Sequence, residues 1–274
     1  MTTAQRFGPA PGRHRPWPLC RQCSGVALDL GSARTRAWVA GRGVILDVPT
    51  VTPVGTDAVH PIRRGAIVDT PAAARMLEGL LARRLSRLGP PLVIVTTPVL
   101  DGVAYRTEAR AALEVLGPRA VLTVPTARAV ALAAGADLSH PLLVVDIGAH
   151  LTEVVLLSDG AVADARGTTL GTSDLDDTTT HTQITDAVVD MVTTMLRQDS
   201  TSLTIDALRR GVLLAGGGSL RPEITYGLSG RLHAPAKPVP APHTAAVRGA
   251  ATILEAAHIH PSTTGTVPAV LYPR

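Results

Sequence analysis

Residues 26–38 alternate between apolar runs and a short polar turn, a pattern that predicts a β-hairpin. The first run reaches Asp29, and Gly31, which has no Cβ, would let the backbone of the turn approach a ligand closely. The N–H groups of such a turn can form a seat for an anion, to which the hydroxyls of Ser32 and Thr35 would add donors. Asp29 would hold a hydrated Mg²⁺ that the anion brings with it. The alternative is a buried strand that ends in an ordinary Asp-Leu-Gly turn.

A second stretch, residues 142–157, repeats this pattern of an apolar run, a glycine turn and an apolar return. Asp146 stands near the strand end, Gly148 lies two residues further on, and Thr152 supplies a hydroxyl. Two hairpins of one design predict a duplicated fold that holds one ligand between its halves.

A third turn, rich in glycine, follows a buried strand within residues 211–220. Gly216, Gly217 and Gly218 would bring backbone rather than side chains against a flat or phosphorylated ligand. The residues after this turn are expected to form a helix.

Segments with strand and helix patterns alternate along the rest of the chain, which predicts an α/β sheet protein. Residues 24–53 are expected to form three short strands, and residues 54–65 are loop-like. In residues 72–88 the apolar side chains recur at helical spacing. Further helices are expected at residues 105–116, 126–135, 184–196 and 244–257.

Three motifs in the order Asp-Leu-Gly-Ser, Asp-Ile-Gly and Ala-Gly-Gly-Gly-Ser resemble the phosphate-1, phosphate-2 and adenosine motifs of the actin-like ATPases. That superfamily also contains sugar kinases and the ATPase domains of heat-shock chaperones. Residues 38–49, 93–98 and 245–250 are closer still to MreB, the family of bacterial rod-shape actin homologues. The resemblance extends over residues 24–258. Because residues 38–49 continue the first motif, these are five motifs in the right order, which is a stronger signal than any one of them.

The resemblance implies an α/β protein with a duplicated RNase H-like (actin-like ATPase) fold, whose two domains enclose a cleft for ATP and Mg²⁺. Domain I would comprise residues 24–138 with the helix at residues 244–258, and domain II residues 139–243. Residues 1–23 would form a disordered basic tail and residues 259–274 a loose one. The residues implied in nucleotide binding are Asp29, Gly31, Ser32, Thr35, Asp146, Gly148, Gly216, Gly217 and Gly218, of which Asp29 and Asp146 would also hold the metal.

The chain departs from this family in length, because both inserted subdomains are missing or very short. Only residues 54–65 separate the first three strands from the helix that begins near residue 72. After residues 170–175 the chain moves almost directly to the helix at residue 184. In relatives these subdomains roof the nucleotide cleft and make many filament contacts, so their loss predicts poor self-assembly.

The chemistry of the motifs departs as well. The phosphate-2 turn of the family is rich in glycine and is followed by threonine, whereas Ala149, His150 and Leu151 occupy it here. His150 and Leu151 would crowd the phosphate, although the imidazole can also donate to it. The family's catalytic acid corresponds best to Tyr105, and Glu108 lies one turn further along, out of register. Since hydrolysis needs a positioned water and a base within reach, weak or absent ATP hydrolysis is expected.

Composition and charge exclude several classes of protein function. Apolar residues make up 45% of the 274 residues and can support real cores, but only 2% are aromatic. The formal charge of +4 comes without a basic stripe or an aromatic platform, which argues against nucleic acid as a partner. Lys237 is the only lysine, so a P-loop and a catalytic-lysine kinase site are excluded. Arg36 would supply positive charge near the phosphates or be a plain surface arginine.

The two cysteines, Cys20 and Cys23, form one Cys-x-x-Cys pair. A structural zinc site normally needs four ligands, and the nearby His14 does not complete the set, so two chance thiols in a reduced cytosol are the favoured interpretation. Residues 1–19 contain no apolar signal segment, their prolines would break the membrane helix of some MreB proteins, and no run is long enough to span a membrane. A cytoplasmic protein is therefore expected.

The leading hypothesis is a reduced MreB-like actin homologue of the cytoskeleton that acts in cell shape. It would bind nucleotide with weak or absent hydrolysis, and its partners would be further copies of itself or other morphogenesis proteins. Two alternatives stay open. One is an active ATPase or small-molecule kinase of the superfamily, and the other is a non-polymerising adaptor related to division or pilus-assembly proteins.

Overall fold

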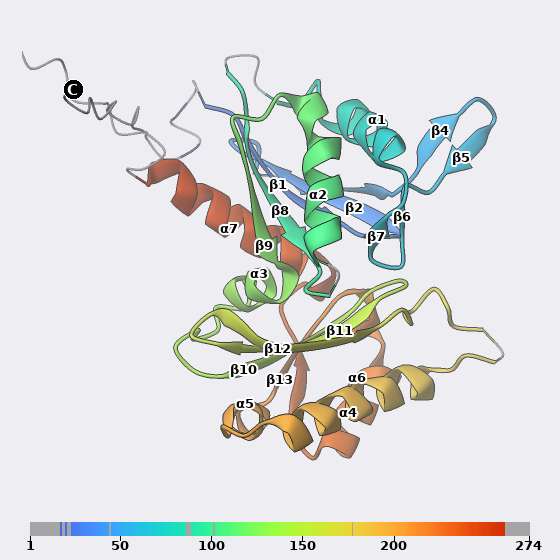
Figure 1. Ribbon diagram of the computed structural model, residues 1–274, viewed down its shortest axis with the longest axis vertical. Helices are drawn as coiled ribbons and strands as arrows, with labels where there is room; N and C mark the ends of the chain where they lie inside the picture. The colour runs from blue at the N-terminus through green and yellow to red at the C-terminus, as the bar shows by residue number, and fades with distance from the viewer. Residues whose placement is uncertain are drawn as a thin grey trace, which may run out of the picture.

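The computed structural model describes Trp17, Cys20 and residues 23–43, 45–85, 89–100, 102–176 and 178–260. Within these residues the chain forms two domains, drawn one above the other in Figure 1, and each is built on a five-stranded sheet. The strands of the first sheet are β1 (Gly25–Leu30), β2 (Arg34–Val39), β3 (Ile45–Pro49), β8 (Leu92–Thr97) and β9 (Ala120–Pro125). The strands of the second sheet are β10 (Leu142–Ile147), β11 (Thr152–Ser158), β12 (Ala161–Thr168), β13 (Val212–Ala215) and β14 (Ala236–Pro238).

The two sheets have the same topology. Their strand orders are β3-β2-β1-β8-β9 and β12-β11-β10-β13-β14. In each sheet the first three strands of the order are joined antiparallel, whereas the last three are joined parallel. The duplicated fold that the two hairpins predict is therefore confirmed.

Side-chain alternation explains why each sheet is covered on both faces. In β10, Leu143, Val145 and Ile147 belong to the core on one face, while Leu142 and Val144 belong to the core on the other. Successive side chains of a strand point to opposite faces, so an uninterrupted apolar run requires packing on both sides. The helices provide it. They are α1 (Thr70–Leu81), α2 (Gly102–Leu113), α3 (Thr126–Ala133), α4 (His181–Gln198), α5 (Leu203–Arg210), α6 (Pro222–Leu232) and α7 (Ala245–Ile259), with 3₁₀ turns at Glu114–Leu116, Gly217–Leu220 and Pro242–Thr244.

The layers follow one another from domain I to domain II. Helices α1 and α2 cover the outer face of the first sheet, and α4, α5 and α6 cover the outer face of the second (Figure 1). Helices α3 and α7 lie between the two sheets and pack against both. They approach each other very closely, because a Cβ at Gly249 of α7 would meet the backbone of Ala129 in α3. A close contact between two helices requires a small residue at such a point.

Several sequence predictions need correction. Residues 54–65 are not a loop, because they belong to two small hairpins formed by β4 (Thr52–Val54) with β5 (Asp57–Val59) and by β6 (Ile62–Arg63) with β7 (Ala66–Ile67). The expected helix at residues 72–88 ends already at Leu81. Helix α5 follows a short polar stretch and was not expected from the sequence. These differences concern short elements, whose patterns extend over too few residues to be distinctive.

The ends of the chain are described in part. Of the expected tail at residues 1–23, the structure describes Trp17, Cys20 and Cys23, and Trp17 packs against the core beside α7. At the other end, Ile259 is the last residue of α7, and residues 261–274 lie outside the described part. None of the helices in the described residues is long and apolar enough to cross a membrane.

Candidate functional site

A cavity of about 290 Å³ lies between the two domains. It is lined by the turn of the β1–β2 hairpin, by the turn of the β10–β11 hairpin and by the glycine turn after β13. Three segments that are far apart in the sequence thus meet at one place, as the repeated motifs predict. The predicted site residues that line this cavity are Asp29, Gly31, Ser32, Asp146, Gly148, Gly216 and Gly217.

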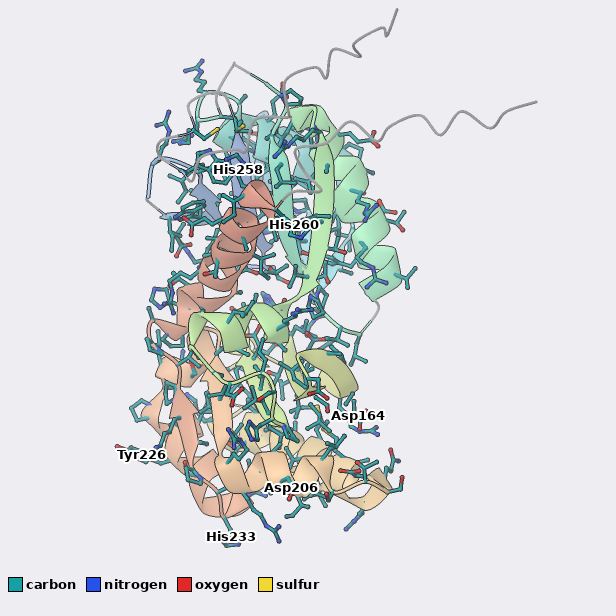
Figure 2. The ribbon with its side chains drawn as sticks, turned by 90° about the vertical axis from the view of Figure 1, so that its left-hand side faces the viewer. Asp164, Asp206, Tyr226, His233, His258 and His260 are labelled. Atoms are coloured by element: carbon teal, nitrogen blue, oxygen red, sulfur yellow. The ribbon has the colours of Figure 1, made fainter. Side chains whose placement is uncertain are left out.

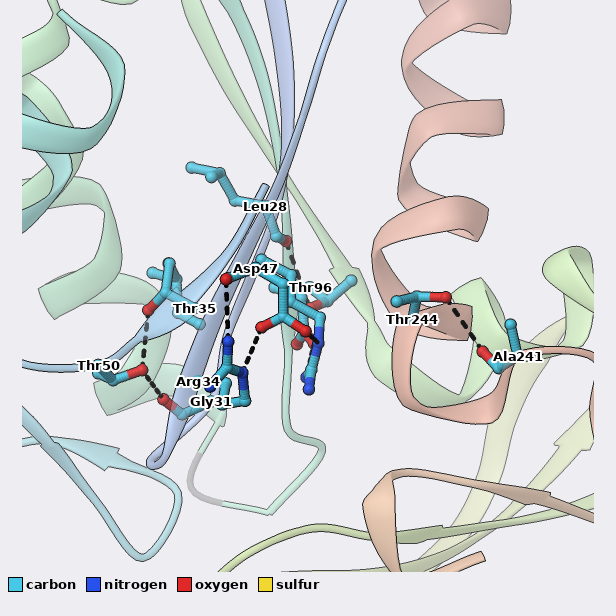
Figure 3. A network of polar contacts seen from close by, with 12 residues as sticks. Leu28, Gly31, Arg34, Thr35, Asp47, Thr50, Thr96, Ala241 and Thr244 are labelled. Atoms are coloured by element: carbon cyan, nitrogen blue, oxygen red, sulfur yellow. Dashed lines mark hydrogen bonds and ion pairs between the residues drawn. The ribbon is translucent and has the colours of Figure 1, made fainter. Parts of the chain in front are cut away.

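Two predicted site residues do not line the cavity. The fully buried Thr35 lies on the face of β2 that packs against α1, and its hydroxyl bonds to that of Thr50 at 2.9 Å. Thr50 in turn donates to the carbonyl oxygen of Gly31 at 2.7 Å, so the two threonines stabilise the turn from inside the core (Figure 3). Gly218 is buried against Ile147, whose side chain would overlap a Cβ at that position. Alternation along the strand places Thr35 on the core face, away from the ligand side.

Asp29 is the carboxylate of the first hairpin. The hydroxyl of Thr96 donates to it at 3.0 Å, and the guanidinium of Arg36 lies 3.6 Å away on the opposite strand. Burial raises the pKa of Asp29, while Arg36 and the hydrogen bond from Thr96 act against this rise. The side chain of Arg36 is only 15% exposed and also contacts Asp47 at 3.2 Å. Arg36 is therefore not a plain surface arginine, and its charge is shared between two carboxylates.

Asp146 is the carboxylate of the second hairpin and lacks such a cation on the opposite strand. Glu153 occupies that position, paired with Asp146 across β10 and β11. Burial, together with the negative charges of Asp29 and Glu153, raises the pKa of Asp146 to about 7, against a smaller opposite effect of Arg36. A large part of Asp146 is thus protonated at neutral pH, and a cation that binds there must displace this proton.

Glu153, which lines the cavity, joins the two domains. Its carboxylate accepts hydrogen bonds from the backbone N–H groups of Val99 and Leu100, which follow β8 in domain I, at 3.0 and 3.1 Å. Burial raises the pKa of Glu153, and these two bonds counteract the rise. Sequence analysis missed this residue, although its place opposite Asp146 in the predicted hairpin was a usable signal.

The position of the expected catalytic acid has a different role here. Tyr105 lines the cavity, but it is buried and its hydroxyl donates to the carbonyl oxygen of Leu30 at 2.8 Å. Burial raises the pKa of Tyr105 far above its ordinary value, so it is no base at neutral pH. Glu108 accepts a hydrogen bond from Thr70 of α1 and is not among the residues that line the cavity. The acids that line the described cavity are Asp29, Asp146 and Glu153.

The turn after β10 narrows the cavity. Leu151 packs against Gly65 in the β6–β7 hairpin so closely that a Cβ on Gly65 would meet its side chain at 2.7 Å. The neighbouring residue in this hairpin, Arg64, reaches across to domain II, where it pairs with Asp174 at 2.8 Å and donates to the carbonyl oxygen of Thr169. The β6–β7 hairpin and the turn after β10 therefore contact each other directly beside the cavity.

Two histidine residues that line the cavity each contain a nitrogen atom without a hydrogen-bond partner among the described residues. Within the described part of the chain, the Nδ1 atoms of His150 and His243 are buried and have no hydrogen-bond partner, and both residues line the cavity. Buried polar atoms without a partner are rare in folded proteins unless a ligand or water satisfies them. By contrast, a Cβ at Gly217 would meet open space. The glycine turn thus presents backbone to the cavity.

These residues fit an anion that carries a divalent cation. Asp29 and Asp146 offer the oxygen ligands that Mg²⁺ prefers, from opposite walls of the cavity. In each hairpin the N–H of the glycine is used inside the turn, from Gly31 to Arg34 at 3.1 Å and from Gly148 to Leu151 at 2.8 Å. The phosphates would therefore be held by the following N–H groups and by the side chains of the turns.

Comparison with known proteins agrees with this architecture. The family described as MreB/Mbl protein matches residues 51–182 and 178–261 of the chain. The cell shape-determining protein MreB of Escherichia coli (strain K12) is 27% identical over 178 residues, which are 53% of this chain and 51% of that protein. The cell shape-determining protein Mbl of Bacillus cereus (strain ATCC 10987 / NRS 248) is 24% identical over 164 residues, or 50% of this chain and 49% of that protein.

Solved structures show the same fold. The crystal structure of MreB5 of Spiroplasma citri bound to ADP superposes with a TM-score of 0.76 at 18% identity, covering 89% of this chain and 99% of the other. A structure of the MamK double helical filament gives a TM-score of 0.70 at 15% identity, covering 85% of this chain and 98% of the other. The chain spans about half the length of the curated relatives it matches. Because the family match covers well over half of its residues, the chain belongs to the MreB/Mbl family and has the actin-like fold.

Proposed function

We propose that the chain is a nucleotide-binding cytoskeletal protein of the MreB type that acts in cell shape. ATP with Mg²⁺ would bind between the two domains as a structural ligand and be hydrolysed slowly or not at all. The observation that carries this proposal is the convergence of the two acid-and-glycine hairpins and the Gly216–Gly217 turn on one cavity. The MreB5 relative is known in structures bound to ADP and to AMPPNP, which supports a nucleotide as the ligand.

Specific residues would divide the task. Asp29 and Asp146 would hold the metal through its water shell, and Ser32 with the turn N–H groups would bind the phosphates from the side of domain I. His150 and His243, which line the cavity, would donate to the anion through their imidazole rings. Each of these contacts joins ligand to only one domain, so the ligand itself would link the two.

Slow hydrolysis follows from the same cavity. The hydroxyl of Tyr105 donates to the carbonyl oxygen of Leu30, and the carboxylate of Glu153 accepts from two backbone N–H groups. A base must reach the attacking water. Tyr105 keeps its proton at neutral pH, and Glu153 is held against the backbone of Val99 and Leu100 through its Oε1 atom. An active ATPase is thus the less supported alternative.

Isothermal titration with ATP tests the proposal, with and without Mg²⁺. We expect Asp29→Ala to weaken the Mg²⁺-dependent part of binding, because one of the two carboxylates is lost. Gly217→Leu would fill the open space beside the glycine turn and abolish binding. Its matched control is Gly230→Leu in α6, where a Cβ also meets open space, but away from the cavity. Binding that survives Gly217→Leu unchanged would refute the proposed site, and rapid phosphate release would show an active ATPase.

The relatives support a further copy of the same chain as the partner, since MamK has been seen as a double helical filament. The segments that replace the inserted subdomains are small here, namely two short hairpins and residues 169–180. We therefore expect filaments that are weaker or shorter than those of full-length relatives. Electron microscopy and sedimentation with ATP would reveal them, and a protein that stays monomeric with ATP bound would favour the adaptor alternative.

A further inference from the structure

The structure brings together three metal-binding side chains at the end of domain I that is remote from the cavity. The ligand atoms of Cys20, Cys23 and His258 all lie within 4.8 Å of one another. Both cysteines precede β1, whereas His258 belongs to the last turn of α7, where Figure 2 labels it. Sequence spacing alone favoured chance thiols, because the third ligand comes from the opposite end of the chain. The other histidine considered there, His14, lies outside the described residues.

We propose that Cys20, Cys23 and His258 form a Zn²⁺ site, with its fourth position open to water. Two thiolates and one imidazole are ligands that zinc prefers, and Cys-x-x-Cys is a spacing that supplies two of them to one ion. Tetrahedral zinc with bonds of about 2.0–2.3 Å places its ligand atoms roughly 3.5–3.8 Å apart. The three side chains therefore need to move by only about an ångström to bind it.

The surroundings hold the imidazole in place. His258 is fully buried, and the indole of Trp17 stacks on its ring at 3.8 Å with an angle of 12° between the planes. The indole N–H of Trp17 also donates to the backbone carbonyl oxygen of Cys23 at 3.2 Å. One side chain thus orients the histidine ligand and fixes the backbone of a cysteine ligand, as outer residues of metal sites do.

Charge balance favours zinc at this buried place. Two thiolates neutralise the two charges of the ion, and a neutral imidazole adds none, so the assembly carries no net charge into the interior. The alternative is a redox pair. Cys20 and Cys23 are thiols in the structure, and the imidazole of His258 beside them supplies a third ligand atom, which a metal site needs and a redox pair does not.

The site would fasten both ends of the described chain to domain I. Helix α7 packs on β1 and β8 and on α3, so it joins domain I to the layer between the sheets. A metal bond from α7 to the segment before β1 closes almost the whole chain into a loop. Cross-links of this kind stabilise the folded state by restricting the unfolded chain. Zinc would thus act as a structural staple, independently of any nucleotide.

Metal binding to the full-length, untagged protein tests the proposal under reducing conditions. After removal of metal by a chelator, we expect Co²⁺ to bind at one equivalent with sulfur-to-cobalt charge-transfer absorption, and Zn²⁺ to displace it. Zn²⁺ should also raise the apparent melting temperature of the wild-type protein. Cys20→Ser and Cys23→Ser should each weaken the charge-transfer band and remove the melting shift. Absence of Co²⁺ and Zn²⁺ uptake by the wild-type protein would overturn the proposal.

Histidine variants separate the site from unspecific metal binding. His258→Gln should weaken metal affinity while leaving the thiolate charge-transfer band in place, whereas His260→Gln, exposed two residues further on, should bind like wild type. Circular dichroism in the absence of metal identifies a variant that fails to fold, and the two cysteine variants then decide the question. Unchanged zinc affinity and unchanged melting shift in folded Cys20→Ser would refute the site.

Discussion

The two hairpins that face each other across the cavity share a backbone but carry opposite charges at matching positions. In the β1–β2 hairpin, Asp29 lies opposite Arg36, and in the β10–β11 hairpin Asp146 lies opposite Glu153. In both turns the glycine N–H donates to the residue three positions further on. The duplication thus preserves geometry and leaves the electrostatics free to differ.

This difference assigns different tasks to the two carboxylates. Asp29 has a cation within reach, which favours its charged form, whereas Asp146 faces two further acids and keeps its proton up to a pH of about 7. Glu153, in place of a cation, accepts two N–H groups from the other domain. Under the proposed function, domain I would therefore supply the carboxylate that is already charged for a metal, while Glu153 of domain II makes a contact that holds the halves together.

The largest change in stability is expected from a substitution at Glu153, the residue that distinguishes the second hairpin from the first. Glu153→Ala leaves the partly buried N–H groups of Val99 and Leu100 without their acceptor, and we expect it to lower the free energy of unfolding by on the order of 2–3 kcal/mol. Chemical denaturation measures this change. Glu153→Gln is the matched control, because its amide oxygen can still accept while the charge beside Asp146 disappears. Equal losses in the two variants would show that the cross-domain hydrogen bonds contribute little.

Asp146 should reveal its raised pKa in the pH dependence of stability. A carboxyl that binds its proton more tightly in the folded state contributes stability below its unfolded pKa of about 4, and this contribution is lost as the pH rises to about 7. Asp146→Asn removes that loss, so the variant should gain stability relative to wild type as the pH rises from 5 to 8, by on the order of 2–3 kcal/mol. Melting temperatures across this range measure the gain.

The control for this pH dependence is Asp176→Asn. Asp176 is exposed, and hydrogen bonds from Thr178 and Thr179 lower its pKa below the ordinary value, so its titration lies below the tested range. The Asp176→Asn curve should therefore run parallel to that of wild type from pH 5 to pH 8. If the Asp146→Asn curve ran parallel to it as well, Asp146 would be charged throughout and the contrast between the hairpins would disappear.

The residues that follow the turn glycine differ between the two hairpins and can be exchanged. Ser32 and Ala149 each follow the turn glycine and line the cavity. We expect Ser32→Ala to weaken ATP binding and Ala149→Ser to strengthen it, each by about 1 kcal/mol or a few-fold in Kd, since one hydroxyl donor is removed or added. Titration calorimetry on both variants and the double exchange tests this. A loss of affinity in both single variants would mean that Ala149 lies too close to its neighbours to accept a hydroxyl.

The sequence predicted the parts of this site that depend on backbone pattern. Apolar runs ending at Asp29 and Asp146 and the glycines after them were sufficient for the duplicated sheets and their meeting point, because alternation and turn geometry are local properties. What it could not show depends on which face a side chain occupies or on distant partners. Thr35 lies on the core face of its strand and not on the face towards the cavity. Glu153 accepts hydrogen bonds from residues of the other domain, which the sequence does not place beside it.

The smallest effect is expected at Arg64, which links the two domains at a second place. Its guanidinium joins the β6–β7 hairpin of domain I to Asp174 of domain II, and the N–H of the next residue, Gly65, donates to Ser32 at 3.3 Å. Because the pair is half exposed to solvent, Arg64→Ala should cost less than about 1 kcal/mol of stability. It should nevertheless raise the dissociation rate of bound nucleotide several-fold, since the contact joins the two domains beside Gly65, which lines the cavity. Stopped-flow release of a fluorescent ATP analogue measures this, with Arg63→Ala as the neighbouring control. Equal release rates in the two variants would show that Arg64 does not limit nucleotide release. The Glu153 contact would then be the link between the domains that limits it.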